Sequence, residues 1–135
     1  MSALYLLDTN ICVHIRRRNR VVLRRMQDIP AASFAISVIT LGQLALGRSK
    51  SPDPARSQLE FESVQNLLTV LPVPVEAAEH YGDIRALLSG RGEIIGANDL
   101  WIAAHARASG LVLVTGNMRE FRRVPGLSVE DWTKS

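Results

Sequence analysis

Cysteine and long apolar runs are scarce in this 135-residue chain, and each scarcity excludes a class of protein. Cys12 is the single cysteine, so the chain can form no internal disulfide, and three scattered histidines do not complete a zinc site with it. No apolar stretch approaches the roughly 18 residues that span a bilayer, and residues 1–4 lack the basic flank of a signal peptide. We therefore expect a protein of the reducing cytoplasm, without secretion and without a membrane partner.

Apolar residues, by contrast, are abundant, and basic residues gather in three places. Apolar side chains make up 47% of the chain, and its length suits one folded domain over residues 1–135. The net charge is +3, and the basic clusters lie at residues 16–20, 24–25 and 119–123. Such clusters can follow a phosphate backbone, although Arg-rich helix faces are also common as plain solvated surface. Charge alone therefore leaves nucleic acid as one of two interpretations.

Short apolar runs alternate with segments of helical periodicity along the chain. The runs predict strands at residues 4–7, 34–36, 70–73, 111–114 and 127–129. The periodic segments predict helices at residues 11–16, 21–27, 37–46, 55–68, 75–89 and 98–109, with a short turn at 119–121. This alternation is typical of a three-layer α/β/α fold with a central, mainly parallel, twisted sheet. Gly47 is expected to end the third helix, and the helices at 55–68 and 75–89 are expected to pair as a hairpin or lid.

Polar side chains follow two of the predicted strands. Residues 8–10 (DTN) come after the first strand, and residues 115–117 (TGN) come after the strand at 111–114. Ligands of an open α/β sheet bind outside the carboxyl ends of its strands, so we expect Asp8 and Asp99 to converge there. Carboxylates without a Cys or His cluster suit Mg²⁺ or Mn²⁺. The alternative is that Asp8, Asn98 and Asp99 are only helix N-caps.

Four short motifs stand in a fixed order along the chain. They are residues 6–10 (LLDTN), 36–41 (ISVITL), 98–103 (NDLWIA) and 114–117 (VTGN). In this order they resemble the VapC-type toxins, which are PIN-domain ribonucleases of type II toxin–antitoxin systems, and the resemblance runs from residue 4 to residue 132. It implies a PIN fold, a homodimer, Mg²⁺- or Mn²⁺-dependent cleavage of RNA, and inhibition by a VapB-type antitoxin. It also implies a tRNA substrate, and the tail resembles toxins that cut an anticodon loop, which favours initiator tRNA.

The resemblance also assigns roles to particular residues. Asp8 and Asp99 match the family's metal-binding aspartates, and Asn117 occupies its fourth acidic or amide position. Glu120 is expected to add a carboxylate from the same face of a helical turn, with a solvated surface glutamate as the alternative. The residues expected to orient these groups by hydrogen bonds are Thr9, Asn10, Asn98 and Thr115.

Gln43 departs from the family pattern. The second motif normally carries a catalytic Glu in a helix that ends in Gly, whereas residues 42–47 (GQLALG) present an amide there. Glutamine is nearly isosteric with glutamate, so folding should survive, but the pocket loses one negative charge and gains an NH₂ donor that faces a cation. Loss of a ligand is expected to lower metal affinity or activity by at least about tenfold. We therefore expect weak or absent nuclease activity, whether Gln43 is natural or a deliberate inactivating change.

Two other functions fit parts of the pattern. A signalling receiver domain is also a doubly wound sheet with an acidic pocket, but its phosphorylated Asp follows a middle strand and a Lys follows a late strand. Here the late strand is followed by Thr115. The second alternative is a catalytically silent PIN module that binds RNA or an antitoxin without cleaving RNA, and Gln43 is compatible with that function.

The remaining reactive side chains are assigned no chemistry. Cys12 lies in an apolar run without a neighbouring base, so it is interpreted as a small buried core residue rather than a nucleophile. The histidines at positions 14, 80 and 105 match no metal-binding spacing and are interpreted as helix residues. Trp101 and Trp132 are expected in the core.

Overall fold

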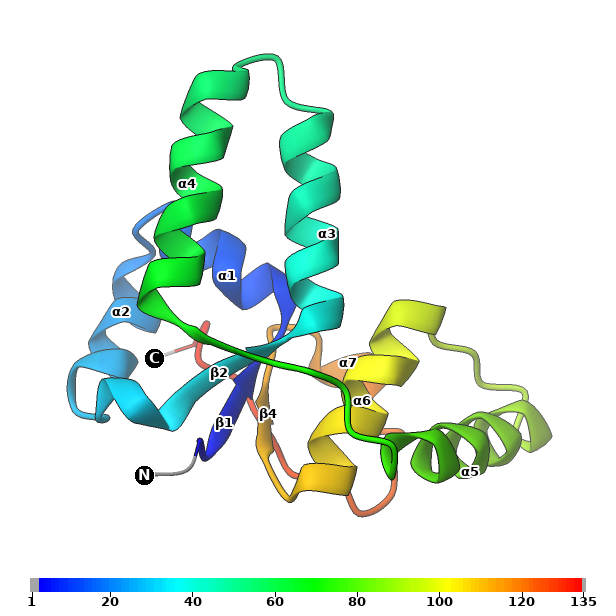
Figure 1. The fold of residues 1–135 in the computed structure, drawn as a ribbon. Helices are drawn as coiled ribbons and strands as arrows, with labels where there is room; N and C mark the ends of the chain where they lie inside the picture. The colour runs from blue at the N-terminus through cyan, green and yellow to red at the C-terminus, as the bar shows by residue number, and fades with distance from the viewer. Residues whose placement is uncertain (1–2, 135) are drawn as a thin grey trace.

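The computed structural model describes residues 3–134 and contains a five-stranded, all-parallel sheet (Figure 1). Its strands are β1 (Tyr5–Leu7), β2 (Phe34–Ser37), β3 (Thr69–Leu71), β4 (Val112–Val114) and β5 (Val129–Glu130). They stand in the order β3-β2-β1-β4-β5, with Leu6 of β1 beside Ala35 of β2 and Leu113 of β4. Because β1 is central, the segment that follows it lies between the segments that follow β2 and β4.

Helices cover both faces of this sheet, as predicted. They are α1 (Thr9–Arg16), α2 (Arg20–Gln27), α3 (Val38–Ser49), α4 (Pro54–Leu67), α5 (Ala77–Gly90), α6 (Ala97–Ser109) and α7 (Met118–Phe121), with a 3₁₀ turn, η1, at Ala31–Ser33. Each predicted strand and helix is present within a few residues of its predicted place. The predicted three-layer α/β/α architecture is therefore confirmed.

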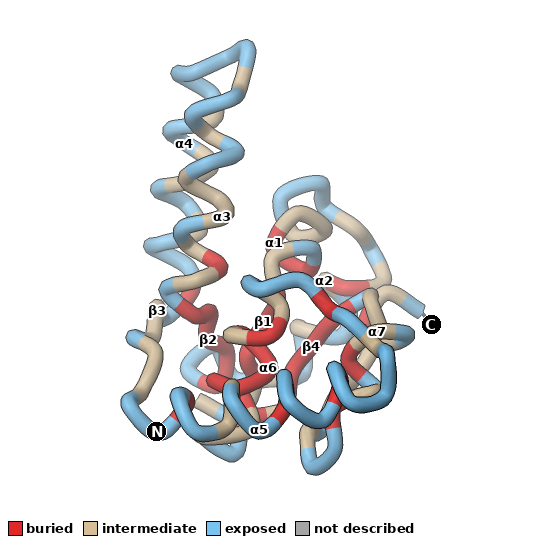
Figure 2. Tube along the Cα trace, turned by 90° about the vertical axis from the view of Figure 1, so that its right-hand side faces the viewer, coloured by how far each residue is buried: buried red, intermediate tan, exposed pale blue. Residues whose placement is uncertain are grey.

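The strands divide their side chains between two cores, which form the buried parts of the trace in Figure 2. Leu6 packs with residues of α5, α6 and α7, whereas Leu7 packs with residues of α1, α2 and the C-terminal segment. Trp132 is fully buried in the second core, as predicted, and its ring lies 5.9 Å from that of Phe34. Trp101, also predicted in the core, is instead only half-buried and stacks on the ring of Tyr81.

Helices α3 and α4 form a hairpin that projects beyond the sheet (Figure 1), and two predictions about this region are wrong. Helix α3 runs past Gly47 to Ser49, because packing on α4 offsets the cost of about 1 kcal/mol for a helical glycine. Helix α4 pairs with α3 and not with α5, because β3 lies between α4 and α5 in the chain. As a result, Val64 of α4 packs in one core and Ile84 of α5 in the other.

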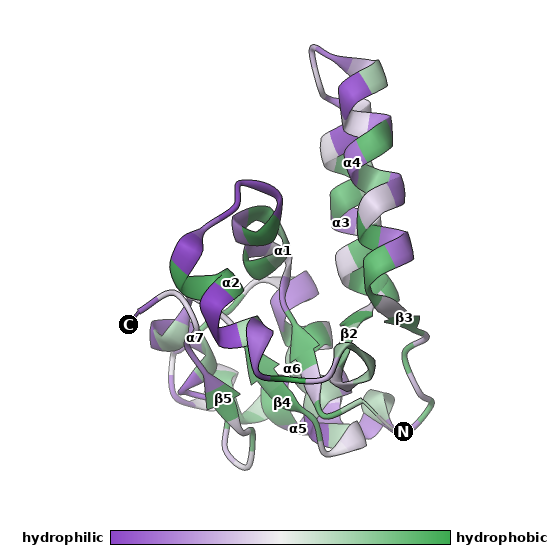
Figure 3. Cartoon of the chain, turned by 90° about the vertical axis from the view of Figure 1, so that its left-hand side faces the viewer, coloured by the Kyte–Doolittle hydropathy of each residue, from purple (hydrophilic) through white to green (hydrophobic). Residues whose placement is uncertain are grey.

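Hydropathy follows this architecture. The strands of the sheet are hydrophobic, and the outer end of the α3–α4 hairpin is hydrophilic (Figure 3). Within residues 3–134, no helix combines the length and the apolar composition needed to cross a bilayer.

Gly110 provides a test of the local structure that leads into β4. It ends α6 at a φ of 65°, in the left-handed region where a Cβ is unfavourable. Gly110→Ala is therefore expected to lower the free energy of unfolding by about 1 kcal/mol. Gly82→Ala, inside α5 with no atom within 4 Å of the added Cβ, is the control and should raise it by up to about 1 kcal/mol. Denaturant unfolding measures both changes, and equal effects of the two substitutions would contradict this account.

Candidate active site

Asp8 connects three segments at the carboxyl end of the central strand. It follows β1 and caps α1, where its Oδ1 accepts a hydrogen bond from the Ile11 N–H at 3.0 Å. Its Oδ2 accepts a hydrogen bond from the hydroxyl of Thr115, the residue that follows β4. Thr115 is fully buried, and its hydroxyl oxygen also accepts the Asn117 N–H at 2.9 Å. One carboxylate therefore joins β1, α1 and the loop after β4.

The surroundings of Asp8 disfavour its charged form. Burial, with only 4% of the residue exposed, raises the pKa of Asp8 to about 6. The negative charge of Asp99 also raises this pKa, whereas the hydrogen bonds from Thr115 and Ile11 lower it. A nearby cation would relieve the electrostatic cost of keeping this carboxylate ionised. The position therefore suits a cation ligand.

Asp99 reaches the same place from the first turn of α6. The helix begins at Ala97, and its N-cap is Gly96, so no side chain caps this helix. The predicted capping of this helix by Asn98 and Asp99 is therefore wrong. Burial raises the pKa of Asp99, and so do the charge of Glu120 and a hydrogen bond with it. Glu120 is thus a half-buried neighbour of Asp99 rather than an isolated surface glutamate.

Gln43 approaches these carboxylates from α3. The Thr9 hydroxyl donates a hydrogen bond to Oε1 of Gln43, which links the first turn of α1 to the middle of α3. A pocket of about 310 Å³ lies where these helices meet the ends of β1 and β4. The residues that line it are Asp8, Thr9, Asn10, Val13, Gln43, Asp99, Asn117 and Phe121.

Three predicted site residues do not line this pocket. Thr115 is buried behind Asp8, Glu120 contacts Asp99, and Asn98 is exposed. Two lining residues, Val13 and Phe121, were missed by the sequence analysis. Val13 lies four residues after the predicted Thr9, and Phe121 lies four residues after the predicted Asn117. Because such spacing places side chains on one helix face, it could have identified both.

The oxygen atoms that line the pocket suit a hard divalent cation, but the pocket has few negative charges to bind one. Carboxylate and amide oxygens are ligands that Mg²⁺ and Mn²⁺ prefer. Within residues 3–134, however, no three His, Cys, Asp or Glu side chains are grouped closely enough to hold a metal ion. Gln43 lines the pocket together with Asp8 and Asp99, so a carboxylate at this position would add a third acidic group.

A buried hydrogen bond connects the two helices that carry Gln43 and Asp99. Ser37 caps α3 by accepting the Ile39 N–H at 3.1 Å, and its hydroxyl lies 3.0 Å from Nδ1 of His105 in α6. Burial lowers the pKa of His105, which favours the neutral imidazole. Sequence reasoning gave this histidine no chemistry, and the structure gives it a part in holding α3 against α6.

Comparison with known proteins assigns the fold and the site to a family. The PIN domain family matches residues 5–127 of this chain. Over 129 residues, the chain is 43% identical to Ribonuclease VapC2 of Haemophilus influenzae, an alignment that covers 95% of this chain and 97% of the relative. The chain belongs to the VapC family of PIN-domain ribonucleases.

Other VapC proteins extend the similarity. The tRNA(fMet)-specific endonuclease VapC of Shigella flexneri is 40% identical over 129 residues, which are 96% of this chain and 98% of that relative. The structure of DNA-bound VapBC from Salmonella typhimurium matches with a TM-score of 0.90 at 40% identity, over 96% of this chain and 98% of that chain. VapBC2 from Rickettsia felis matches with a TM-score of 0.89 at 36% identity, over the same shares of the two chains.

Membership of the VapC family confirms the predicted PIN fold and the predicted endoribonuclease class. It also excludes the signalling receiver domain. PIN-domain ribonucleases generally depend on a divalent metal, which agrees with the oxygen donors of the pocket. The roles of individual pocket residues remain predictions.

Two substitutions separate the structural and the chemical contributions of Asp8. Asp8→Asn keeps an acceptor for the Ile11 N–H and removes a buried charge, but its NH₂ group cannot accept the Thr115 hydroxyl, so the unfolding temperature at pH 7 should fall less than in Asp8→Ala. Asp8→Ala removes the cap and leaves the Thr115 hydroxyl without its acceptor, so it should lower the free energy of unfolding by about 1–3 kcal/mol. Unfolding in the presence of a chelator measures both. An Asp8→Asn variant that is less stable than Asp8→Ala would refute this assignment.

Proposed function

We propose that this VapC-family chain is a metal-dependent endoribonuclease toxin that acts on tRNA and that its activity is impaired by Gln43. The observation that carries the proposal is the presence of Asp8 and Asp99 in one oxygen-lined pocket at the carboxyl end of the sheet. The two aspartates come from sequence positions far apart; Asp8 caps α1, whereas Asp99 caps no helix, because the N-cap of α6 is Gly96. The convergence of Asp99 on Asp8 is therefore better explained by a shared ligand than by local structure.

In this proposal Asp8 and Asp99 hold Mg²⁺ or Mn²⁺. The bound cation would neutralise charge on the phosphate and lower the pKa of the water that attacks the phosphodiester. The Thr115 hydroxyl keeps the Asp8 carboxylate in its orientation, and Glu120 adds negative charge beside Asp99. Residues that line the pocket and are proposed to orient RNA or water are Thr9, Asn10 and Asn117.

Gln43 is the residue proposed to limit the reaction. An amide carries no charge, and its oxygen already accepts the Thr9 hydroxyl, so it is a weaker cation ligand than a carboxylate. The pocket then holds a cation with two aspartates only. A lower metal affinity, and with it slower cleavage, is the expected result.

The substrate and the partners are proposed from the relatives. The Shigella flexneri relative is named a tRNA(fMet)-specific endonuclease, and several matched structures are VapBC complexes. We infer that initiator tRNA is the substrate of this chain, with the cut in its anticodon loop, and that a VapB-type antitoxin inhibits it. A homodimer and a cytoplasmic location, where tRNA is present, belong to the same proposal.

A catalytically silent module that binds RNA or an antitoxin is the second candidate function. The observation that favours it is the lack of a third acidic side chain in the pocket, where Gln43 stands. The observation against it is the charge of the buried Asp8. Burial raises the pKa of this carboxyl group, and its cap of α1 requires an acceptor but no charge, so a module without a cation would not need a carboxylate there.

Restoring the charge at position 43 tests the proposed impairment. Gln43→Glu should increase metal-dependent cleavage of a bulk tRNA pool by at least about tenfold, because it adds a third carboxylate to the pocket. Gln43→Asn, which also alters the side chain but adds no charge, is the matched control and should show no gain. Cleavage is followed on denaturing gels with Mg²⁺ or Mn²⁺, and with a chelator to establish metal dependence.

The same assay separates the two candidate functions. Asp99→Asn placed in the Gln43→Glu background should cancel the gain, because it removes one of the two proposed metal ligands. If folded Gln43→Glu protein cleaves no RNA in either metal, the nuclease proposal fails and the silent binding module takes its place.

Substrate choice is tested with purified tRNAs. The Gln43→Glu variant should cut initiator tRNA within the anticodon loop and leave elongator methionine tRNA, which carries the same anticodon, largely intact. Mapping the 5′ ends of the products locates the cut. Equal cleavage of both tRNAs, or cuts outside the anticodon loop, would show that the specificity differs from that in the name of the Shigella relative.

A further inference from the structure

A second and larger cavity lies between α1 and the α3–α4 hairpin. Its volume is about 590 Å³, compared with about 310 Å³ for the candidate active site. The carboxylates that line it are Asp53 and Glu60. The basic side chains that line it are Arg16, Arg17, Arg48, Lys50 and Arg56. Positive charge therefore predominates, and we call this cavity the basic groove.

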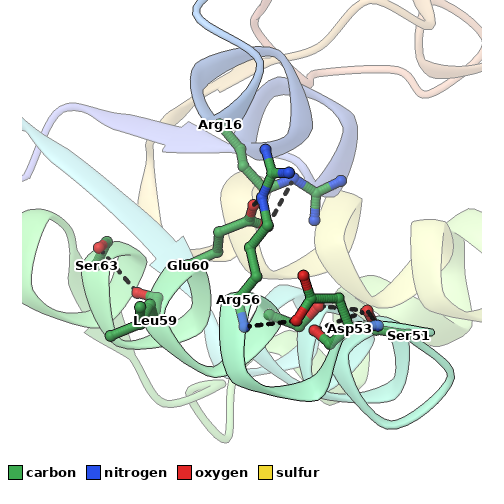
Figure 4. Close-up of polar contacts among 8 residues, drawn as sticks. Arg16, Ser51, Asp53, Arg56, Leu59, Glu60 and Ser63 are labelled. Carbon is green, nitrogen blue, oxygen red and sulfur yellow. Dashed lines mark hydrogen bonds and ion pairs between the residues drawn. The ribbon is translucent and has the colours of Figure 1, made fainter.

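Glu60 of α4 lies between two arginines of the basic groove (Figure 4). Its Oε2 is 3.4 Å from Nε of Arg16 in α1, and its Oε1 is 3.2 Å from Nε of Arg56 in α4. One carboxylate thus neutralises two guanidinium groups in part. The Asp53 carboxylate is occupied differently, because it caps α4 by accepting the Arg56 N–H at 3.2 Å.

The other three cations of the basic groove are not paired with a carboxylate of the described residues. No ion pair within residues 3–134 involves Arg17, Arg48 or Lys50. The Arg48 guanidinium lies 4.2 Å from the centre of the Phe61 ring and donates a hydrogen bond to Gln58 at 3.2 Å. The basic groove therefore holds uncompensated positive charge next to an aromatic surface.

The basic groove lies further along two helices that also line the candidate active site. The contact between Thr9 of α1 and Gln43 of α3 lies in the active-site pocket. Further along the same helices, Arg16 and Arg48 line the basic groove. A helix rises about 1.5 Å per residue, so the two places are about 10 Å apart. An RNA strand that enters the active site could therefore reach the basic groove within a few nucleotides.

We propose that the basic groove binds the phosphate backbone of the RNA strand that extends from the active site, and that Glu60 is a resident counterion that these phosphates displace. The proposal rests on the proposed ribonuclease function. Phosphates pair strongly with arginine, whereas partly exposed ion pairs such as Arg16–Glu60 are weak and are easily exchanged. The excess of cations favours a polyanion over an apolar protein segment as the occupant.

Two variants with opposite expected effects test this assignment. Binding of a labelled single-stranded RNA is measured by fluorescence anisotropy in a chelator, across a series of salt concentrations. The double variant Arg17→Ala/Lys50→Ala should lower affinity about tenfold and reduce the slope of log K against log salt by about 1.4. Glu60→Gln should instead increase affinity severalfold, because it frees two arginines for phosphate. The control, Arg24→Ala/Arg91→Ala, removes exposed arginines outside the basic groove and should change little.

Several outcomes would overturn the proposal. One is equal RNA affinity of the Arg17→Ala/Lys50→Ala variant and its control. Another is weaker binding by a Glu60→Gln variant whose unfolding temperature is unchanged. Retained RNA binding together with lost binding to a purified VapB-type antitoxin would assign the basic groove to the protein partner instead. Because binding is measured without metal, a Gln43→Glu variant that cleaves no RNA would refute the nuclease proposal and leave this test unaffected.

Discussion

The hydrogen bond between the Asp8 carboxylate and the Thr115 hydroxyl is the contact on which the pocket depends. It joins the ends of two adjacent parallel strands, and the same carboxylate caps the helix that follows the first of them. The arrangement removes Asp8 almost completely from water, so burial opposes its ionisation more than the two hydrogen bonds favour it. The fold therefore holds a buried carboxylate whose ionised form a nearby cation would stabilise.

Helices α1 and α3 begin at the pocket and extend from it to the basic groove. Helix α1 begins at the Asp8 cap, and α3 begins at the Ser37 cap, which is in turn held by His105 of α6. Both helices leave the sheet at neighbouring strand ends and remain in contact through Thr9 and Gln43. Their far ends form two walls of the basic groove, so the position of that groove relative to the pocket is set by helix geometry rather than by a flexible loop.

Local sequence patterns predicted the strands and helices, which depend on neighbouring residues. They did not predict helix pairing, which depends on the order of the strands in the sheet. The apolar runs identified the strands, and the rule for parallel strand ends brought Asp8 and Asp99 together. The pairing of α4 with α3 was missed, because it follows from the place of β3 beside β2, which periodicity does not encode. The clustering of charge in the sequence identified residues 16–20 as basic. It could not show that Arg48 and Arg56 of the hairpin line the same cavity, because these residues approach residues 16–20 only in the folded chain.

Under the proposed function, stability without metal and catalysis make opposite demands on the side chain at position 43. Glutamine and ionised glutamate can both accept the Thr9 hydroxyl, so either residue preserves the contact between α1 and α3. They differ in charge. The pKa of Asp8 is already raised to about 6 by burial and by Asp99, and a third carboxylate in the same pocket would increase the repulsion further. Glutamine avoids this repulsion when no cation is bound, whereas under the proposed function the repulsion of a glutamate would be relieved by the bound cation.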